Sequence, residues 1–177
     1  MSRKVALLGG SFDPPHLAHV QVIKHLLQSD KYDEVWVVPT CQNPFKEDGT
    51  PFEQRLAMCR LAFGELGERV QVRDDEKNLS GFAIELVRYL SKRNPHHHWT
   101  FVAGSDLKDQ VDHWKDGSEL KKMIKFEFFL RGGEEGSPFL PLSSTEAREV
   151  ARHGGDLKKI LPEKVADYVQ REQLYRQ

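Results

Sequence analysis

The stretch 10–19 combines residue types that suit phosphate binding. Gly9 and Gly10 follow a short apolar run, so the backbone can approach a ligand there without a Cβ in the way. His16 and His19 are three residues apart, which places both on one face in the first turn of a helix. Unpaired N–H groups and the helix dipole attract anions at that end. We therefore expect hydrogen-bond donation to phosphate oxygens; the alternative is a tight turn with two surface histidines.

A second phosphate-binding pattern lies near the end of the chain. Ser143, Ser144 and Thr145 put three hydroxyls at an expected helix start, and Ser143 with Glu146 forms an S-x-x-E capping box. Arg148 lies one helical turn further on. Hydroxyls, free N–H groups and a guanidinium together suit a polyphosphate. The alternative is a capped surface helix with an exposed arginine.

Alternating strand and helix patterns supply a fold that brings these groups together. The expected strands are 4–8, 34–39, 70–72, 99–104 and 126–130. The expected helices are 17–29, 52–64, 82–93, 120–124, 145–152 and 162–174. This alternation predicts an α/β fold, a Rossmann-like doubly wound parallel sheet with helices on both faces, in a single domain over 1–177. Such sheets bind ligands at the carboxyl ends of the strands, where the strand order reverses.

Both patterns resemble motifs of one family. Residues 10–19 (GSFDPPHLAH) resemble the G-x-F-D-P-x-H-x-G-H signature of the nucleotidyltransferase superfamily of small adenylyl- and cytidylyltransferases, with Ala18 in place of the second Gly. Residues 142–148 (LSSTEAR) are similar to its I-S-S-T-x-x-R motif. The resemblance implies that His16 and His19 are catalytic and stabilise the leaving pyrophosphate. It also implies ATP contacts at Gly10, Ser11, Phe12, His16, His19, Ser143, Ser144, Thr145 and Arg148.

Further matches indicate one branch, the nicotinate mononucleotide adenylyltransferases. Gly104 and Asp106 match a G-x-D sequence that, in the family, touches the ribose of ATP. Arg131 resembles the arginine of an R-P-G turn, with Gly132 in place of the proline, and is another implied ATP contact. Trp114 falls eight residues after Asp106, where the branch places a tryptophan near the pyridine ring.

The acceptor side departs most from the branch pattern. The loop 38–46 keeps Lys46 but has Phe45 where the branch has histidine. Residues 80–86 (SGFAIEL) stand where the branch carries S-Y-T-x-D-T-L, a segment that receives the pyridine ring and its carboxylate. The implied acceptor contacts are Lys46, Ser80, Gly81, Phe82 and Trp114.

The resemblance implies an adenylyltransferase of NAD biosynthesis. It would transfer AMP from ATP to nicotinate mononucleotide or nicotinamide mononucleotide and release pyrophosphate. Mg²⁺ would bridge the phosphate oxygens of ATP, and we expect no metal ligands from the protein. The alternatives are another acceptor such as phosphopantetheine, and a non-catalytic nucleotide-binding sensor. The position of Trp114 argues against the first, and the intact His16, His19 and Arg148 argue against the second.

The overall composition excludes several other classes. The chain has 177 residues, with 26 basic and 27 acidic side chains, so nothing predicts nucleic-acid binding. No apolar run approaches the roughly 20 residues that span a bilayer, so we expect no membrane partner. The first residues lead directly into a strand, unlike a signal peptide. Cys41 and Cys59 are too few for a disulfide framework, so we expect reduced thiols in a cytoplasmic protein. A homo-oligomer is left open.

Overall fold

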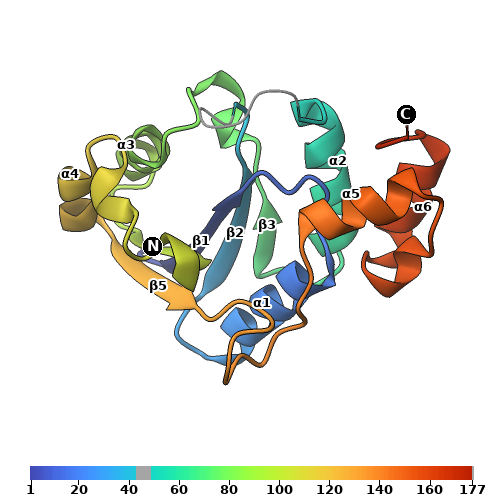
Figure 1. Cartoon of the computed structure of the whole chain (residues 1–177). Helices are drawn as coiled ribbons and strands as arrows, with labels where there is room; N and C mark the ends of the chain where they lie inside the picture. The colour runs from blue at the N-terminus through green and yellow to red at the C-terminus, as the bar shows by residue number, and fades with distance from the viewer. Residues whose placement is uncertain (43–48, 177) are drawn as a thin grey trace.

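The computed structural model describes residues 1–42 and 49–176, in which five strands form one sheet (Figure 1). The strands are β1 (Lys4–Gly10), β2 (Glu34–Pro39), β3 (Val70–Val72), β4 (His98–Gly104) and β5 (Lys125–Phe129). Their order is β3-β2-β1-β4-β5, and every neighbouring pair is parallel. The chain builds outward from β1 to β3 and then crosses back to place β4 on the other side of β1. This is the doubly wound sheet that the sequence predicts.

The helices follow the predicted alternation. They are α1 (Leu17–Gln28), α2 (Phe52–Phe63), α3 (Ala83–Arg93), α4 (Gly117–Met123), α5 (Ser144–Arg152) and α6 (Glu163–Arg171). Short 3₁₀ turns at Asp75–Asn78, Ser105–Leu107, Val111–His113 and Leu157–Lys159 were not predicted. The helix expected at 120–124 begins earlier, at Gly117, because the Asp116 carbonyl accepts the N–H groups of Glu119 and Leu120 at 3.0 and 2.9 Å and so closes an earlier first turn.

Helices cover both faces of the sheet, as predicted (Figure 1). One apolar cluster joins the sheet to α1, α2, α5 and α6, with fully buried Ile23, Phe63 and Val165. The other joins it to α3 and α4, with fully buried Ile84 and Leu120. Strand β2 is buried along its whole length, as an interior parallel strand covered on both faces should be.

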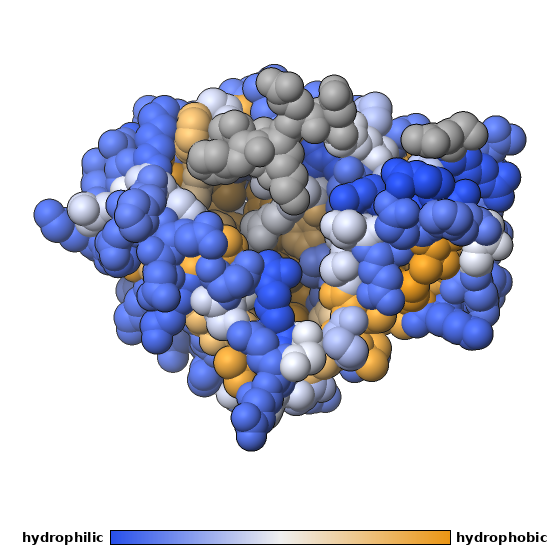
Figure 2. Space-filling view, viewed as in Figure 1, coloured by the Kyte–Doolittle hydropathy of each residue, from blue (hydrophilic) through white to orange (hydrophobic). Residues whose placement is uncertain are grey.

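The sheet opens at the point where the strand order reverses. Pairing between β1 and β4 runs from Lys4–His98 to Leu8–Val102, two residues before each strand ends. Pairing between β1 and β2 continues to Gly10–Pro39. The carboxyl ends of β1 and β4 therefore separate. Figure 2 shows the molecule hollowed at its centre, between the side that carries α3 and α4 and the side that carries α5 and α6.

Two other predictions can be compared with the structure. Cys41 and Cys59 are free thiols, as expected, and burial raises the pKa of Cys59. Within residues 1–42 and 49–176, no helix has the length and apolar character needed to cross a bilayer.

Candidate active site

The two histidines of the first motif meet at the start of α1. Their rings stack with centroids 3.7 Å apart, as the three-residue spacing predicts. The His16 N–H donates to Nδ1 of His19 at 3.1 Å. Because that nitrogen accepts a hydrogen bond, a neutral His19 carries its proton on Nε2. Phe12 supports the pair from the glycine turn, with its ring edge-on to His19 at 5.0 Å.

Both histidines are uncharged at neutral pH. Burial lowers the pKa of His16 to about 4, with the Arg131 guanidinium as a further cause. Burial also lowers the pKa of His19 well below its usual value, with electrostatic interaction with the neighbouring His16 and Arg131 side chains as further causes. His16 is only 7% exposed, and its Nδ1 has no hydrogen-bond partner among the described residues. A buried ring nitrogen in this state can be satisfied by a bound ligand or water.

Helix α5 is fastened to the loop that precedes α1. Ser144 Oγ donates to the Pro14 carbonyl at 2.8 Å, and Arg148 Nη1 donates to the Asp13 carbonyl at 2.7 Å. Arg148 Nη2 also donates to Thr145 Oγ1 at 3.2 Å. These contacts join segments about 130 residues apart, so the amino ends of α1 and α5 lie together. The two sequence patterns for which phosphate binding was predicted therefore lie side by side.

The hydroxyls of α5 have different partners within the chain. Ser143 Oγ accepts the Glu146 N–H at 3.1 Å, which confirms the Ser143 half of the predicted capping box; no return hydrogen bond from the Ser143 N–H to the Glu146 side chain is seen among the described residues. That hydroxyl, like Thr145 Oγ1, keeps its own proton to donate. The Ser144 proton is directed to Pro14, so this side chain fixes the helix in place.

Two residues that shape the site were not among the sequence candidates. Arg55 on α2 is 6% exposed, and it donates to the carbonyls of Ser11, Cys41 and Thr50 at 2.7, 3.0 and 2.8 Å. It thereby binds the glycine turn to the segments on either side of 43–48. Asp13 accepts the Thr50 N–H at 3.1 Å and, on its other oxygen, the Tyr175 hydroxyl at 2.6 Å. Asp13 belongs to the 10–19 motif, which was the available signal.

The end of β4 carries the next group of candidates. Arg131 Nε donates to Asp106 Oδ1 at 2.6 Å, so both predicted residues lie together. Glu134 accepts from the Ser105 hydroxyl at 2.7 Å and from the Arg131 N–H. A Cβ on Gly104 would lie 2.5 Å from Asp106 Oδ1 and 2.9 Å from Arg131 Nε, so glycine leaves the room that this pair needs.

The acceptor candidates gather at the start of α3 and around Trp114. The Trp114 ring is half-buried and lies edge-on to Phe101 at 5.9 Å. Lys115 follows Trp114 directly, and its Nζ stands 4.6 Å from the centre of the Phe82 ring. The structure thus brings the predicted segment 80–82 close to the residue after Trp114. Gly81 has φ 83°, a conformation that favours glycine. Lys46 and Phe45 lie outside the described residues.

One further buried acid lies at the carboxyl end of the sheet. Glu76, in the turn after β3, is 3% exposed, and its Oε2 has no partner among the described residues. Burial raises its pKa to about 7. In the part of the chain that is described, no three His, Cys, Asp or Glu side chains are grouped so that they could hold a metal ion.

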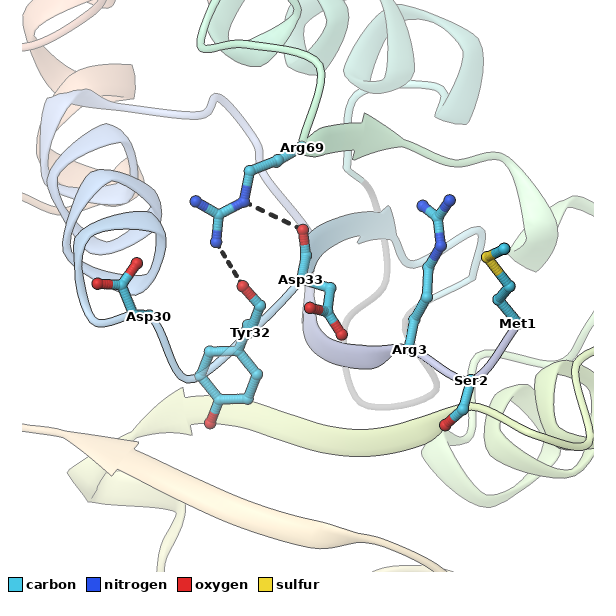
Figure 3. A pocket seen from close by; sticks show the side chains of 7 residues that line it. All are labelled: Met1, Ser2, Arg3, Asp30, Tyr32, Asp33 and Arg69. Atoms are coloured by element: carbon cyan, nitrogen blue, oxygen red, sulfur yellow. Dashed lines mark hydrogen bonds between the residues drawn. The ribbon is translucent and has the colours of Figure 1, made fainter.

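A separate hollow lies at the amino ends of the strands (Figure 3). Arg69 points into it and donates to the carbonyls of Asp33, at 3.1 Å, and Tyr32. Its guanidinium therefore holds the turn before β2. The lining residues are Met1, Ser2, Arg3, Asp30, Tyr32, Asp33 and Arg69. None of them is a sequence candidate, and the hollow is at the opposite edge of the sheet from the paired helix ends.

A doubly wound sheet with two helix amino ends at its switch point defines a nucleotide-binding α/β protein. The sequence model of the Cytidylyltransferase-like family matches residues 7–150. A probable nicotinate-nucleotide adenylyltransferase of Anaeromyxobacter sp. (strain K) is 35% identical over 184 residues, covering 98% of this chain and 97% of that protein. One of Myxococcus xanthus (strain DK1622) is 31% identical over 179 residues, covering 97% and 94%. The chain belongs to the cytidylyltransferase-like family and, within it, to the nicotinate-nucleotide adenylyltransferases.

Solved structures agree on the fold. The Plasmodium falciparum nicotinic acid mononucleotide adenylyltransferase complexed with NaAD superposes with a TM-score of 0.85. It is 23% identical, with 98% of this chain and 97% of that chain covered. A putative nicotinate-nucleotide adenylyltransferase from Vibrio parahaemolyticus superposes with a TM-score of 0.80 at 22% identity, covering 99% of this chain and 96% of that chain.

Proposed function

We propose that this protein transfers the adenylyl group of ATP to nicotinate mononucleotide. A phosphate oxygen of the mononucleotide attacks the α-phosphorus of ATP, the bond from that phosphorus to the bridging oxygen breaks, and pyrophosphate leaves with the electron pair. The observation that carries the proposal is the attachment of α5 to the loop before α1 through Ser144 and Arg148. That attachment brings the amino ends of α1 and α5 together beside two neutral imidazoles, an arrangement that suits a chain of phosphates. The product would enter NAD biosynthesis in the cytoplasm.

On the ATP side, His16 and His19 donate to the oxygens of the departing pyrophosphate. The Nε2 proton of His19 is the donor, since its Nδ1 is held by the His16 N–H. Neutral imidazoles suit this role because they need no proton uptake before the phosphates bind. Donors positioned in advance toward developing charge lower the barrier.

Other residues hold the remainder of ATP. Ser143, Thr145 and Arg148 donate to the β- and γ-phosphates, while Ser144 keeps the first turn of α5 against the loop. The glycine-turn residues Gly10, Ser11 and Phe12 let the backbone approach the nucleotide. Gly104, Asp106 and Arg131 contact the ribose, and the hydrogen bond from Arg131 to Asp106 holds those two side chains together after β4.

On the acceptor side, Trp114 stacks against the pyridine ring. The segment Ser80, Gly81 and Phe82 receives the substituent of that ring, and Lys46 steers the mononucleotide phosphate. Mg²⁺ bound to ATP would neutralise phosphate charge, and we assign it no ligands from the protein. The N–H and O–H donors of α1 and α5 are complementary to the oxygens of such a metal-bound triphosphate.

The test is pyrophosphate release with ATP, Mg²⁺ and each of three acceptors: nicotinate mononucleotide, nicotinamide mononucleotide and phosphopantetheine. We expect the highest kcat/KM with nicotinate mononucleotide. Phosphopantetheine as the best acceptor would refute the choice of substrate. Binding of ATP with no pyrophosphate from any of the three would refute the enzyme and favour a nucleotide sensor.

A further inference from the structure

An ion pair stands at the acceptor side of the site. Lys115 Nζ donates to Glu85 Oε1 at 2.6 Å, which links the segment after Trp114 to the first turn of α3. The other oxygen of Glu85 accepts from the Ser80 hydroxyl and, at 3.4 Å, from the Ser80 N–H. Glu85 therefore already uses two donors in the segment that would receive the pyridine carboxylate.

The charges of this pair affect which base can bind. The Lys115 hydrogen bond, followed by those from Ser80, lowers the pKa of Glu85 to about 2, so this carboxylate is ionised at neutral pH. A second carboxylate placed beside it would be repelled unless a cation stood between them. Lys115 has three N–H donors, and its contact with Glu85 uses one. Lys115 follows Trp114 in the sequence, and its ammonium also lies over the Phe82 ring.

We infer that Lys115 is a specificity-determining residue for the acceptor, and that its ammonium binds the carboxylate of nicotinate mononucleotide while Glu85 holds it in position. The inference rests on the proposed function. It assigns to Lys115 the discrimination between nicotinate mononucleotide, which carries a carboxylate, and nicotinamide mononucleotide, which carries an amide. In this binding mode a pyridine ring stacked on Trp114 would direct its substituent toward the Lys115 ammonium, which lies over the Phe82 ring of the acceptor segment. The carboxylate of the acid gains a charge-assisted hydrogen bond there, whereas the neutral amide of nicotinamide mononucleotide gains less.

The experiment compares kcat and KM for both mononucleotides in the wild type and in Lys115→Met. We expect kcat/KM for nicotinate mononucleotide to fall about 10- to 100-fold, mostly through KM, because a hydrogen bond to a charged group is lost. With nicotinamide mononucleotide the change should be less than about 3-fold. Lys115→Arg should keep the preference for the acid.

A matched control is Lys121→Met. Lys121 is also an exposed lysine in an ion pair, with Asp112, and its side chain is 43% exposed against 45% for Lys115. In Lys121→Met, kcat/KM should be unchanged for both mononucleotides. An equal acid-to-amide ratio in Lys115→Met and wild type would overturn the inference.

A double variant separates direct binding from simple neutralisation of Glu85. In Lys115→Met combined with Glu85→Gln, the ammonium and the repelling carboxylate are both absent. We expect the acid preference to stay low, because the ligand to the carboxylate is missing. Recovery of the wild-type preference would overturn the inference, since Lys115 would then only offset Glu85. A wild type that releases no pyrophosphate with either pyridine mononucleotide refutes the proposed function itself, before any variant is compared.

Discussion

His19→Ala is the substitution that most directly tests the chemistry of the site. It removes the Nε2 donor aimed at the leaving pyrophosphate, and losing one such donor costs about 10²–10³ in turnover, or about 2.7–4 kcal/mol in the barrier. It also removes the ring that accepts the His16 N–H at 3.1 Å and stacks on His16 at 3.7 Å. The lost hydrogen bond contributes about 1 kcal/mol to stability. The effect on rate should therefore exceed the effect on folding.

Two measurements separate these effects. Steady-state pyrophosphate release at saturating ATP and nicotinate mononucleotide gives kcat, and urea unfolding gives the stability of the same variant. His25→Ala is the control on the same helix, because His25 is an exposed residue near its other end whose ring touches Phe129 and Phe139. We expect His25→Ala to have the kcat of the wild type. If folded His19→Ala turns over within about 3-fold of the wild type, against the expected loss, His19 does not stabilise the leaving group.

Three other substitutions test the scaffold around the site. Because burial lowers the pKa of His16 from 6.5 to about 4, the unfolded chain binds a proton that the folded chain excludes. His16 should contribute up to about 3 kcal/mol to the fall in stability between pH 6.5 and 4, and His16→Gln should make that part of the urea-midpoint profile less steep, with the contribution of His19 remaining. Arg55→Met leaves three carbonyl groups without their hydrogen-bond donor and should lower the free energy of unfolding, measured in urea, by about 3 kcal/mol or more. A loss under about 1 kcal/mol would contradict a structural role for the buried guanidinium. A Cβ on Gly132 would lie 1.8 Å from the Leu140 carbonyl oxygen, so Gly132→Ala should lower the free energy of unfolding by about 1–3 kcal/mol; an unchanged melting temperature would refute that close approach.

Local sequence patterns were sufficient to predict the two helix starts at 17 and 144 and the side chains that gather there. Spacing along one helix fixes the stacking of His16 on His19, and the Ser143 cap depends on a residue three positions away. The alternation of apolar runs was equally direct evidence for the parallel sheet. Each of these features is determined within a few residues, where helix and strand geometry apply.

Contacts between distant segments were not predictable in the same way. Arg55 reaches Ser11 across 44 positions, and Tyr175 reaches Asp13 across 162. A single sequence contains no distances between such residues, so their partners depend on how the elements pack. The Ser144 hydroxyl shows the same limit, because its proton goes to a carbonyl 130 positions away.

The contacts of Arg148 have a consequence for the kinetics of nucleotide binding. Its bonds to the Asp13 carbonyl and to Thr145 Oγ1 use two of the five N–H donors of the guanidinium. The others can take phosphate oxygens while the side chain stays in place. The conformational entropy of this arrangement is therefore lost on folding and not on association. ATP should then bind in a single bimolecular step, with no slower phase from movement of α5.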